Sequence, residues 1–373
     1  MQLLFADDNR LQAHGPAKFD DILLAIFLWC LAGTPLSWHK CRGGLSCEWI
    51  GYWLDYSRFQ LGISEGRSTW LIKWGDRIVK EGLVQMRDFA EGLGRLGFCA
   101  GVLEFHRPFL SALYAWSAAA PLGAVLPVPP LVRLTLSWIM DQFRTGRRTT
   151  CCRKPAKDLG VLFKTDAKGE ENEVVIGGWL CCDGRSTKEA PWFSISLSEV
   201  EAPWLFARGH ASRTIASSEL LATLVAVFLF IPVASGNEET LPSRGTIKCQ
   251  GLTDNAGNAF VVSKLMTTKF PLSAVLMQLS TMLSERNLWL DLTWVRREEN
   301  TEADALTNSD FALFSLERRV HVEWKDLPFQ VLEALVKLGS EFVQEIDKFK
   351  EAKKRCSGLP PLRKRRKVLT PWG

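Results

Sequence analysis

Apolar and polar positions in the second half of the chain follow an order typical of a mixed α/β sheet. Three strand-like segments come first, separated by short polar turns, and helical and strand-like segments then alternate. Such an order predicts antiparallel strands joined by hairpins, followed by parallel strands reached through helices. The pattern therefore predicts an α/β fold, a mixed five-stranded sheet with helices on both faces. The expected strands are 160–166, 174–182, 192–197, 246–253 and 288–295, and the expected helices are 217–230, 256–266 and 272–286.

The first half of the chain has short strand-like segments followed by longer helical ones. An apolar segment over 2–5 leads into Asp7 and Asp8, and strand-like runs recur around 49–54 and 59–63. Prolines interrupt the chain after a last short helix, and because proline removes a backbone donor and fixes φ, we expect a stiff connector there. Helical periodicity covers about 17–31, 69–96 and 109–120, and the prolines are Pro121, Pro127, Pro129 and Pro130.

Composition and charge narrow the class of protein. The 373 residues are 47% hydrophobic and 23% charged, which excludes wholesale disorder and a coiled coil. A net charge of +5 permits a polyanionic partner but does not require one. The ten cysteines are scattered without a C-x-x-C pair, so we expect reduced thiols and an intracellular protein. No signal-peptide pattern follows Met1, and the apolar stretches are too short or too broken by proline to span a bilayer, so no membrane partner is expected.

Four acidic side chains in the second half stand at the ends of expected elements. Asp166 and Asp254 end apolar strands, Glu219 lies on the first helix, and Asp304 begins a helix after a polar loop. Because the ends of adjacent strands lie side by side, these carboxylates can converge. Such a cluster needs shifted protonation or a divalent cation, and hard oxygen ligands favour magnesium or manganese. Two such ions activate water for phosphodiester hydrolysis. The alternative is that each residue is a solvated cap or turn.

The segments that carry these carboxylates resemble the four motifs of the ribonuclease H domain of retroelement polyproteins. The motifs agree in residue type, order and approximate spacing, and the resemblance covers about 160–310. It implies that Asp166, Glu219, Asp254 and Asp304 ligate two magnesium (or manganese) ions and that the RNA strand of an RNA–DNA hybrid is cut. The matching segments are 163–169 (FKTDAKG), 217–220 (SSEL), 252–255 (LTDN) and 300–306 (NTEADAL).

Two segments near the start of the chain resemble parts of a reverse transcriptase. Residues 3–8 (LLFADD) resemble the hairpin in which two aspartates follow an aromatic and a small residue, and 48–52 (EWIGY) resembles the segment that grips the primer strand. Helical residues 69–96 then correspond to the thumb. The resemblance implies that Asp7 and Asp8 bind metal and that Trp49, Gly51 and Tyr52 contact nucleic acid.

A reverse transcriptase also needs an earlier catalytic aspartate, the fingers and a nucleotide pocket, all amino-terminal to the aspartate pair. This chain begins only a few residues before Asp7. We therefore expect no polymerase activity from this chain alone, and a missing amino-terminal polymerase portion is a candidate partner. The apolar strand 2–5 is expected to lack its neighbours and to present an open edge.

Two basic stretches are candidates for contact with phosphate backbone. The first spans 144–157, just before the ribonuclease H-like segment, and includes Arg147, Arg148 and Lys154. The second is the tail from Arg363 to Val368. The tail resembles a nuclear localisation signal, and the alternatives are non-specific phosphate binding and a solvated tail.

Together these resemblances imply a truncated reverse transcriptase whose ribonuclease H-like domain hydrolyses RNA in RNA–DNA hybrids by a two-metal mechanism. One alternative is a non-catalytic nucleic-acid-binding remnant of a retroelement, and another is a decayed reading frame without a selected function. The retroelement class, the sequence preference and the oligomeric state are not indicated. The expected organisation is a partial palm (1–66), a helical thumb-like and connection segment (67–120), a proline-rich and basic connector (121–158), the ribonuclease H-like domain (159–320), and a C-terminal helix with a basic tail (321–373).

Overall fold

The computed structural model describes residues 1–5, 8–151, 157–182, 185–206, 210–231 and 247–355. Its largest sheet has five strands in the order β11-β10-β9-β12-β13. The first three strands are antiparallel, and β12 runs parallel to both β9 and β13. This arrangement confirms the predicted mixed sheet, and its strand order is that of a ribonuclease H-like fold. The strands are β9 Lys157–Gly169, β10 Glu173–Leu180, β11 Trp192–Ser198, β12 Ile247–Thr253 and β13 Leu288–Trp294.

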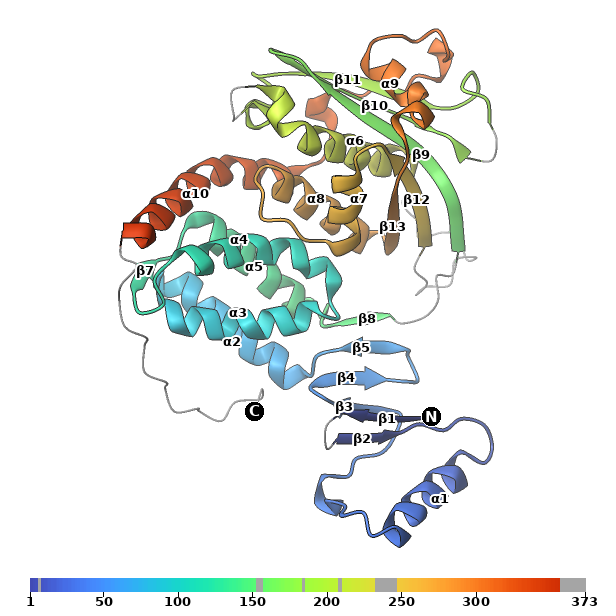
Figure 1. Ribbon diagram of the computed structural model, residues 1–373, viewed down its shortest axis with the longest axis vertical. Helices are drawn as coiled ribbons and strands as arrows, with labels where there is room; N and C mark the ends of the chain where they lie inside the picture. The colour runs from blue at the N-terminus through green and yellow to red at the C-terminus, as the bar shows by residue number, and fades with distance from the viewer. Residues whose placement is uncertain (6–7, 152–156, 183–184, 207–209, 232–246, 356–373) are drawn as a thin grey trace.

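Helices cover both faces of this sheet (Figure 1). The hydroxyl of Thr165 on β9 contacts Thr223 of α6, whereas the next side chain, Asp166, contacts Thr307 of α9. Since successive side chains of a strand point to opposite faces, α6 and α9 lie on opposite sides of the sheet. The helices of this half are α6 Ile215–Phe230, α7 Ala256–Lys264, α8 Leu272–Glu285 and α9 Thr301–Thr307.

Helix α6 lies between the sheet and α8, and most of its side chains are apolar and buried. Leu220, Leu221 and Leu224 have no solvent exposure. Among the described residues, only the stretch Ala211–Phe230 meets the length and composition of a membrane span, and the structure buries most of it inside the protein. Its hydropathy is accounted for by this central position in the core.

The first half contains a bundle of four helices with a shared core (Figure 1). Helix α5 begins at Pro130 and buries Val132, Leu136 and Ile139. The expectation of a stiff connector is therefore wrong for this stretch. The physical reason is that proline is tolerated at the first helical position, where its missing N–H has no partner to lose. The bundle comprises α2 Glu65–Glu81, α3 Met86–Ala100, α4 Arg107–Ala119 and α5 Pro130–Arg144, with the short paired strands β6 Leu83–Gln85 and β7 Val125–Pro127 beside it.

A four-stranded sheet in the order β3-β4-β5-β8 adjoins the bundle. The run predicted around 49–54 is two strands rather than one, because Ile50 and Gly51 adopt positive φ values of 44° and 88° and reverse the chain. Positive φ at both central residues is the geometry of a tight hairpin turn. Part of the expected basic connector forms the fourth strand. The strands are β3 Ser46–Trp49, β4 Tyr52–Asp55, β5 Gln60–Gly62 and β8 Thr149–Cys151.

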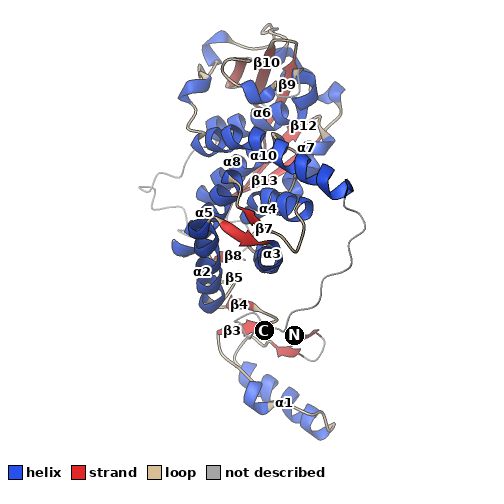
Figure 2. Ribbon diagram, turned by 90° about the vertical axis from the view of Figure 1, so that its left-hand side faces the viewer, coloured by secondary structure: helices blue, strands red, loops and turns tan. Residues whose placement is uncertain are grey.

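The N-terminal segment lies at one end of the molecule (Figures 1 and 2). Strand β1 Gln2–Phe5 pairs with β2 Asp8–Leu11, so the expected strand has a neighbour on one side. Helix α1 Lys18–Leu31 contains no buried residue, although Phe27, Leu28 and Leu31 are apolar. This part of the chain therefore contributes little to the core.

Helix α10, Gln330–Arg355, packs on both halves of the protein (Figure 2). It contacts α8 of the ribonuclease H-like half and α4 and α5 of the bundle. The buried backbone N–H of Leu332 donates to Oε1 of Gln278 on α8 at 2.9 Å. Helix α10 therefore joins the two halves of the protein.

Candidate metal centre

Asp166, Glu219 and Asp254 form a compact carboxylate group. One oxygen from each lies within 4.8 Å of the others. Asp166 is on β9, Asp254 directly follows β12, and these two strands are parallel neighbours, so their side chains lie close together. Glu219 projects from the first half of α6. The structure therefore brings together three of the four carboxylates that the sequence singled out.

Burial and mutual repulsion oppose the ionisation of this group. Burial raises the pKa of Asp166 to about 6, and the negative charge of Asp254 adds to the effect. Burial likewise raises the pKa of Glu219 to about 8, with Asp254 and Asp166 adding to it and a hydrogen bond from Asn255 acting in the opposite direction. One carboxylate oxygen of Asp254 is buried without a hydrogen-bond partner. A divalent cation at this position would neutralise the group and supply that missing partner.

The donor set suits a hard cation. The three side chains offer only carboxylate oxygens, with neither thiolate nor imidazole among them. Oxygen-only sets favour magnesium, manganese or calcium over zinc. These residues therefore fit a magnesium or manganese ion.

Neighbouring polar side chains hold the carboxylates in place. Thr307 donates a hydrogen bond of 3.1 Å to Oδ2 of Asp166, and Asn258 donates to the backbone oxygen of Ala216 at 2.8 Å and more weakly to Glu219 at 3.5 Å. Asn300 donates to the backbone oxygen of Thr165 at 3.1 Å. Sequence reasoning missed Thr307, Asn258 and Asn300. Their only signal was proximity to Asp254 and Asp304 along the chain.

The fourth predicted ligand, Asp304, lies outside the carboxylate group. Its Oδ1 forms an ion pair with Arg297, from which it accepts a hydrogen bond of 2.9 Å. Its Oδ2 accepts a hydrogen bond of 2.9 Å from the side chain of Asn308. Its negative charge still contributes to the raised pKa of Asp166, after burial and the charge of Asp254. Asp304 is thus a neighbour of the group rather than a member of it in this structure.

A glycine lets α9 approach the sheet closely. Gly177 on β10 stands opposite Asp166 in the register of β9 and β10. A Cβ added at Gly177 would come within 2.9 Å of Cβ of Leu306 on α9. Since real Cβ atoms essentially never approach so closely, glycine is required for this packing. The close approach brings Thr307 within reach of Asp166.

The predicted palm residues are mostly engaged in local packing. Tyr52 stacks on Phe98, with ring centroids 4.3 Å apart, and donates from its hydroxyl to the Phe98 backbone oxygen at 3.1 Å. Gly51 occupies the hairpin turn, where its carbonyl accepts from Arg67. The guanidinium of Arg10 stands 5.1 Å from the ring centroid of Trp49. Asp7 lies outside the described residues, and for Asp8 the structure describes only the backbone, in β2.

The first basic stretch is described only in part. Arg148 donates to the backbone oxygen of Ile63 at 2.8 Å and stands over the ring of Trp53. Arg147 donates to the side chain of Gln142 at 3.1 Å. Lys154 and the tail from Arg363 to Val368 lie outside the described residues.

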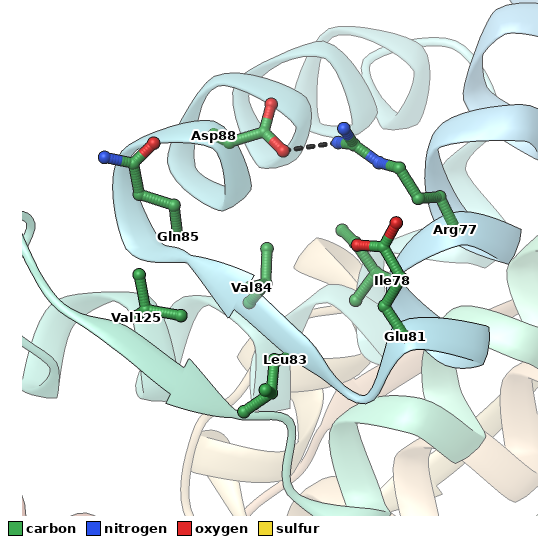
Figure 3. Close-up of a pocket in the computed structure, with 8 residues that line it drawn as sticks. All are labelled: Arg77, Ile78, Glu81, Leu83, Val84, Gln85, Asp88 and Val125. Atoms are coloured by element: carbon green, nitrogen blue, oxygen red, sulfur yellow. Dashed lines mark hydrogen bonds and ion pairs between the residues drawn. The ribbon is translucent and has the colours of Figure 1, made fainter.

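A shallow pocket elsewhere on the surface is distinct from the carboxylate group (Figure 3). It is formed between α2, β6, α3 and β7. Figure 3 shows Arg77 and Asp88 facing each other across it, joined by an ion pair. Because these charges satisfy each other, the pocket offers no unpaired charge from this pair to a ligand.

Comparison with known proteins yields only distant structural similarity. No known family's sequence model matches the chain, and no curated protein sequence matches it. Ribonuclease H1 from the halophilic archaeon Halobacterium salinarum aligns over 98% of its own chain and 42% of this one, with 16% identity and a TM-score of 0.28. The N-terminal ribonuclease H domain of a Mycobacterium tuberculosis protein, fused to maltose-binding protein, covers 42% of this chain and 95% of its own, with 17% identity and a TM-score of 0.28.

Larger structures align with more of the chain. The foamy viral protease-reverse transcriptase in complex with an RNA/DNA hybrid covers 78% of this chain and 35% of its own, with 11% identity and a TM-score of 0.33. Independently of these distant similarities, the strand order and the placement of the helices give residues 157–307 a ribonuclease H-like fold.

Proposed function

We propose that this protein hydrolyses the RNA strand of RNA–DNA hybrids at the group formed by Asp166, Glu219 and Asp254. The observation that carries the proposal is that three carboxylates from β9, α6 and the end of β12 approach within 4.8 Å. Burial and repulsion raise the pKa of two of them, which favours a bound cation at this position. The mixed sheet that positions them supports a nuclease-type active site.

The proposed mechanism assigns a role to each element of the site. Asp166, Glu219 and Asp254 would hold magnesium or manganese, with Asp304 as the fourth ligand when two ions are bound. Ions bound there would supply an activated water and neutralise charge on the phosphate. Thr307 orients the carboxylate of Asp166 through its hydrogen bond. The parallel pairing of β9 with β12 sets the spacing between Asp166 and Asp254.

Hybrid binding in this proposal involves the first half of the chain. We assign residues 1–66 to a partial palm and 67–120 to a thumb-like segment. Nucleic-acid contacts are proposed for Trp49, Gly51, Tyr52, Arg147, Arg148 and Lys154, and metal contacts for Asp7 and Asp8. No polymerase activity is proposed for this chain alone, and a separate polymerase portion is a proposed partner. The tail from Arg363 to Val368 is a proposed nuclear localisation signal of an intracellular protein.

A second candidate function is nucleic-acid binding without cleavage. The observation that favours it is the position of Asp304, which is paired with Arg297 and lies outside the carboxylate group. In that case the basic segments bind and the carboxylates do not catalyse. Binding of this kind weakens steeply with salt.

Cleavage of a labelled RNA–DNA hybrid in magnesium tests the first proposal. We expect hybrid-specific cutting by the wild-type protein, no cutting of an RNA duplex, and loss of activity in Asp254→Asn. Asp291→Asn is the matched control, because Asp291 is an exposed carboxylate on the adjacent strand β13. Salt-sensitive binding of the hybrid by a folded wild-type protein that does not cut would overturn the nuclease proposal and favour the second candidate.

A further inference from the structure

Arg297 provides a positive charge at the edge of the candidate metal centre. It lies in the short 3₁₀ helix Arg297–Glu299, which is separated from α9 by Asn300 alone. Its guanidinium is 2.9 Å from Oδ1 of Asp304, while Asn308 occupies Oδ2 at the same distance. Both oxygens of Asp304 therefore already have a donor, and in this structure its carboxylate is paired with Arg297 and Asn308 rather than joined to the group of three.

The field of the carboxylate group reaches Arg297. The hydrogen bond with Asp304 raises the pKa of Arg297 most, and the charges of Asp166 and Asp254 add to it. Lys164, another cation near this short helix, is engaged elsewhere, because it contacts Glu302 at 3.1 Å and the backbone oxygen of Glu299 at 2.7 Å. Arg297 is thus the described cation that is paired with a predicted ligand of the site.

The pair is weak enough to exchange. The side chain of Arg297 is 76% exposed and that of Asp304 is 34% exposed. Ion pairs this accessible to water contribute little, because solvent screens them and ordering two side chains costs entropy. A divalent cation carries twice the charge of a guanidinium and can replace it at a carboxylate.

We propose that Arg297 competes with a divalent cation for Asp304 and so makes the second metal-binding event weaker than the first. The first ion binds to Asp166, Glu219 and Asp254. The second binds only when Asp304 leaves Arg297 and turns toward the group. This inference rests on the proposed function, since it assumes that the three carboxylates bind metal.

Direct titration with Mn²⁺, followed by calorimetry and by electron paramagnetic resonance, tests this competition without any measurement of activity. In Arg297→Gln we expect the second dissociation constant to fall about 3- to 10-fold, because one positive charge and one ion pair are removed. Arg296→Gln is the matched control, because it removes a neighbouring exposed charge without an ion pair to Asp304. The control is expected to change the second dissociation constant less than twofold.

A double variant identifies the carboxylate involved. We expect Asp304→Asn to weaken binding of the second Mn²⁺ ion in the wild-type background. In the Arg297→Gln background, the same change should abolish the tighter binding of the second ion. Equal second constants in Arg297→Gln and Arg296→Gln, or weaker binding in Arg297→Gln, would overturn the inference while leaving the first site intact. If the wild-type protein binds no Mn²⁺, or binds it equally well in Asp254→Asn, the proposed function is overturned and this inference with it.

Discussion

The hydroxyl of Thr307 donates a hydrogen bond of 3.1 Å to the carboxylate of Asp166, joining the end of α9 to the central strand β9. Both side chains are buried, so the bond is shielded from water. The same helix carries Asp304 and packs on the sheet at Gly177. The geometry of the candidate metal centre therefore depends on the packing of α9 as well as on the two strands.

Replacing Thr307 by valine should loosen Asp166 without creating a cavity. The hydrogen bond favours the ionised carboxylate, so its loss should raise the pKa of Asp166 further and move the lower limb of the cleavage pH profile upward. Cleavage should fall about 10-fold, as for other residues that orient a metal ligand. Thr307→Ser keeps the hydroxyl and should keep both the pH profile and the cleavage rate close to those of the wild type. An unchanged pH profile in Thr307→Val would contradict this role.

Removing the carboxylate of Glu219 should stabilise the metal-free protein at alkaline pH. The pKa of Glu219 is about 8 in the folded protein, above its value in the unfolded chain, so the folded state binds the proton more tightly. The contribution of the protonated side chain to wild-type stability is fully present below about pH 4.5 and is lost as pH rises toward and through 8. In EDTA at pH 8.5 we expect Glu219→Gln to melt about 2–6 °C higher than wild type. Glu333→Gln, an exposed change on α10, should leave the melting temperature unchanged.

Added Mn²⁺ should reverse that order. The wild-type protein gains stability by binding the ion, whereas Glu219→Gln has lost a ligand and gains less. The measurement is the melting temperature with and without the ion at the same pH. A Glu219→Gln protein that melts below wild type in EDTA at pH 8.5 would be inconsistent with a destabilising charge at this position.

His106 should contribute to unfolding by acid. It is buried against Trp138 and Phe143, and burial lowers its pKa to about 4, with the charge of Arg147 adding to the effect. The unfolded chain binds a proton near pH 6.5, so the unfolded state gains protons first and stability falls between pH 6.5 and 4. This histidine accounts for up to about 3 kcal/mol of that loss.

His106→Gln stays neutral over the whole range and should lose less stability on acidification than wild type. Urea unfolding at pH 7 and at pH 4.5 measures the difference, and His321→Gln is the exposed control. Equal losses in His106→Gln and wild type would show that the histidine is not buried in its neutral form.

Two glycines in α3 should respond oppositely to alanine. A Cβ at Gly92 would overlap the ring of buried Trp74, whereas a Cβ at Gly94 would meet no atom within 4 Å. Gly94→Ala should raise the free energy of unfolding by about 0.5–1 kcal/mol through helix propensity. Gly92→Ala should lower it by about 1–3 kcal/mol through overpacking. Urea titration of both variants checks the packing of α2 on α3, and similar effects would refute it.

Much of the sheet could be predicted because its determinants are local. The strand segments are apolar runs bounded by polar turns, and Asp166 and Asp254 converge because they stand at comparable positions on neighbouring parallel strands. The convergence of Glu219 with them follows from its place near the start of α6.

Features that depend on contacts between distant parts of the chain could not be predicted from the sequence. The sequence around Pro130 indicates an interruption, because nothing nearby shows that the residues after it are buried against α2 and α4. The pairing of β8 with β5 joins segments far apart in the chain. Asp304 was expected in the metal group, but Arg297 and Asn308 determine where its carboxylate lies. An exposed α1 was equally unforeseeable from its apolar composition.

The position of α10 has a consequence for cooperativity. Leu332 and Leu335 are buried in a hydrophobic cluster that includes residues of both the four-helix bundle and the ribonuclease H-like half. Detachment of either half would expose apolar surface on the other. Unfolding of one half therefore destabilises the half that remains folded. The two halves should consequently unfold in one transition, with calorimetric and van't Hoff enthalpies that agree, despite a chain length at which separate domains commonly melt in separate steps.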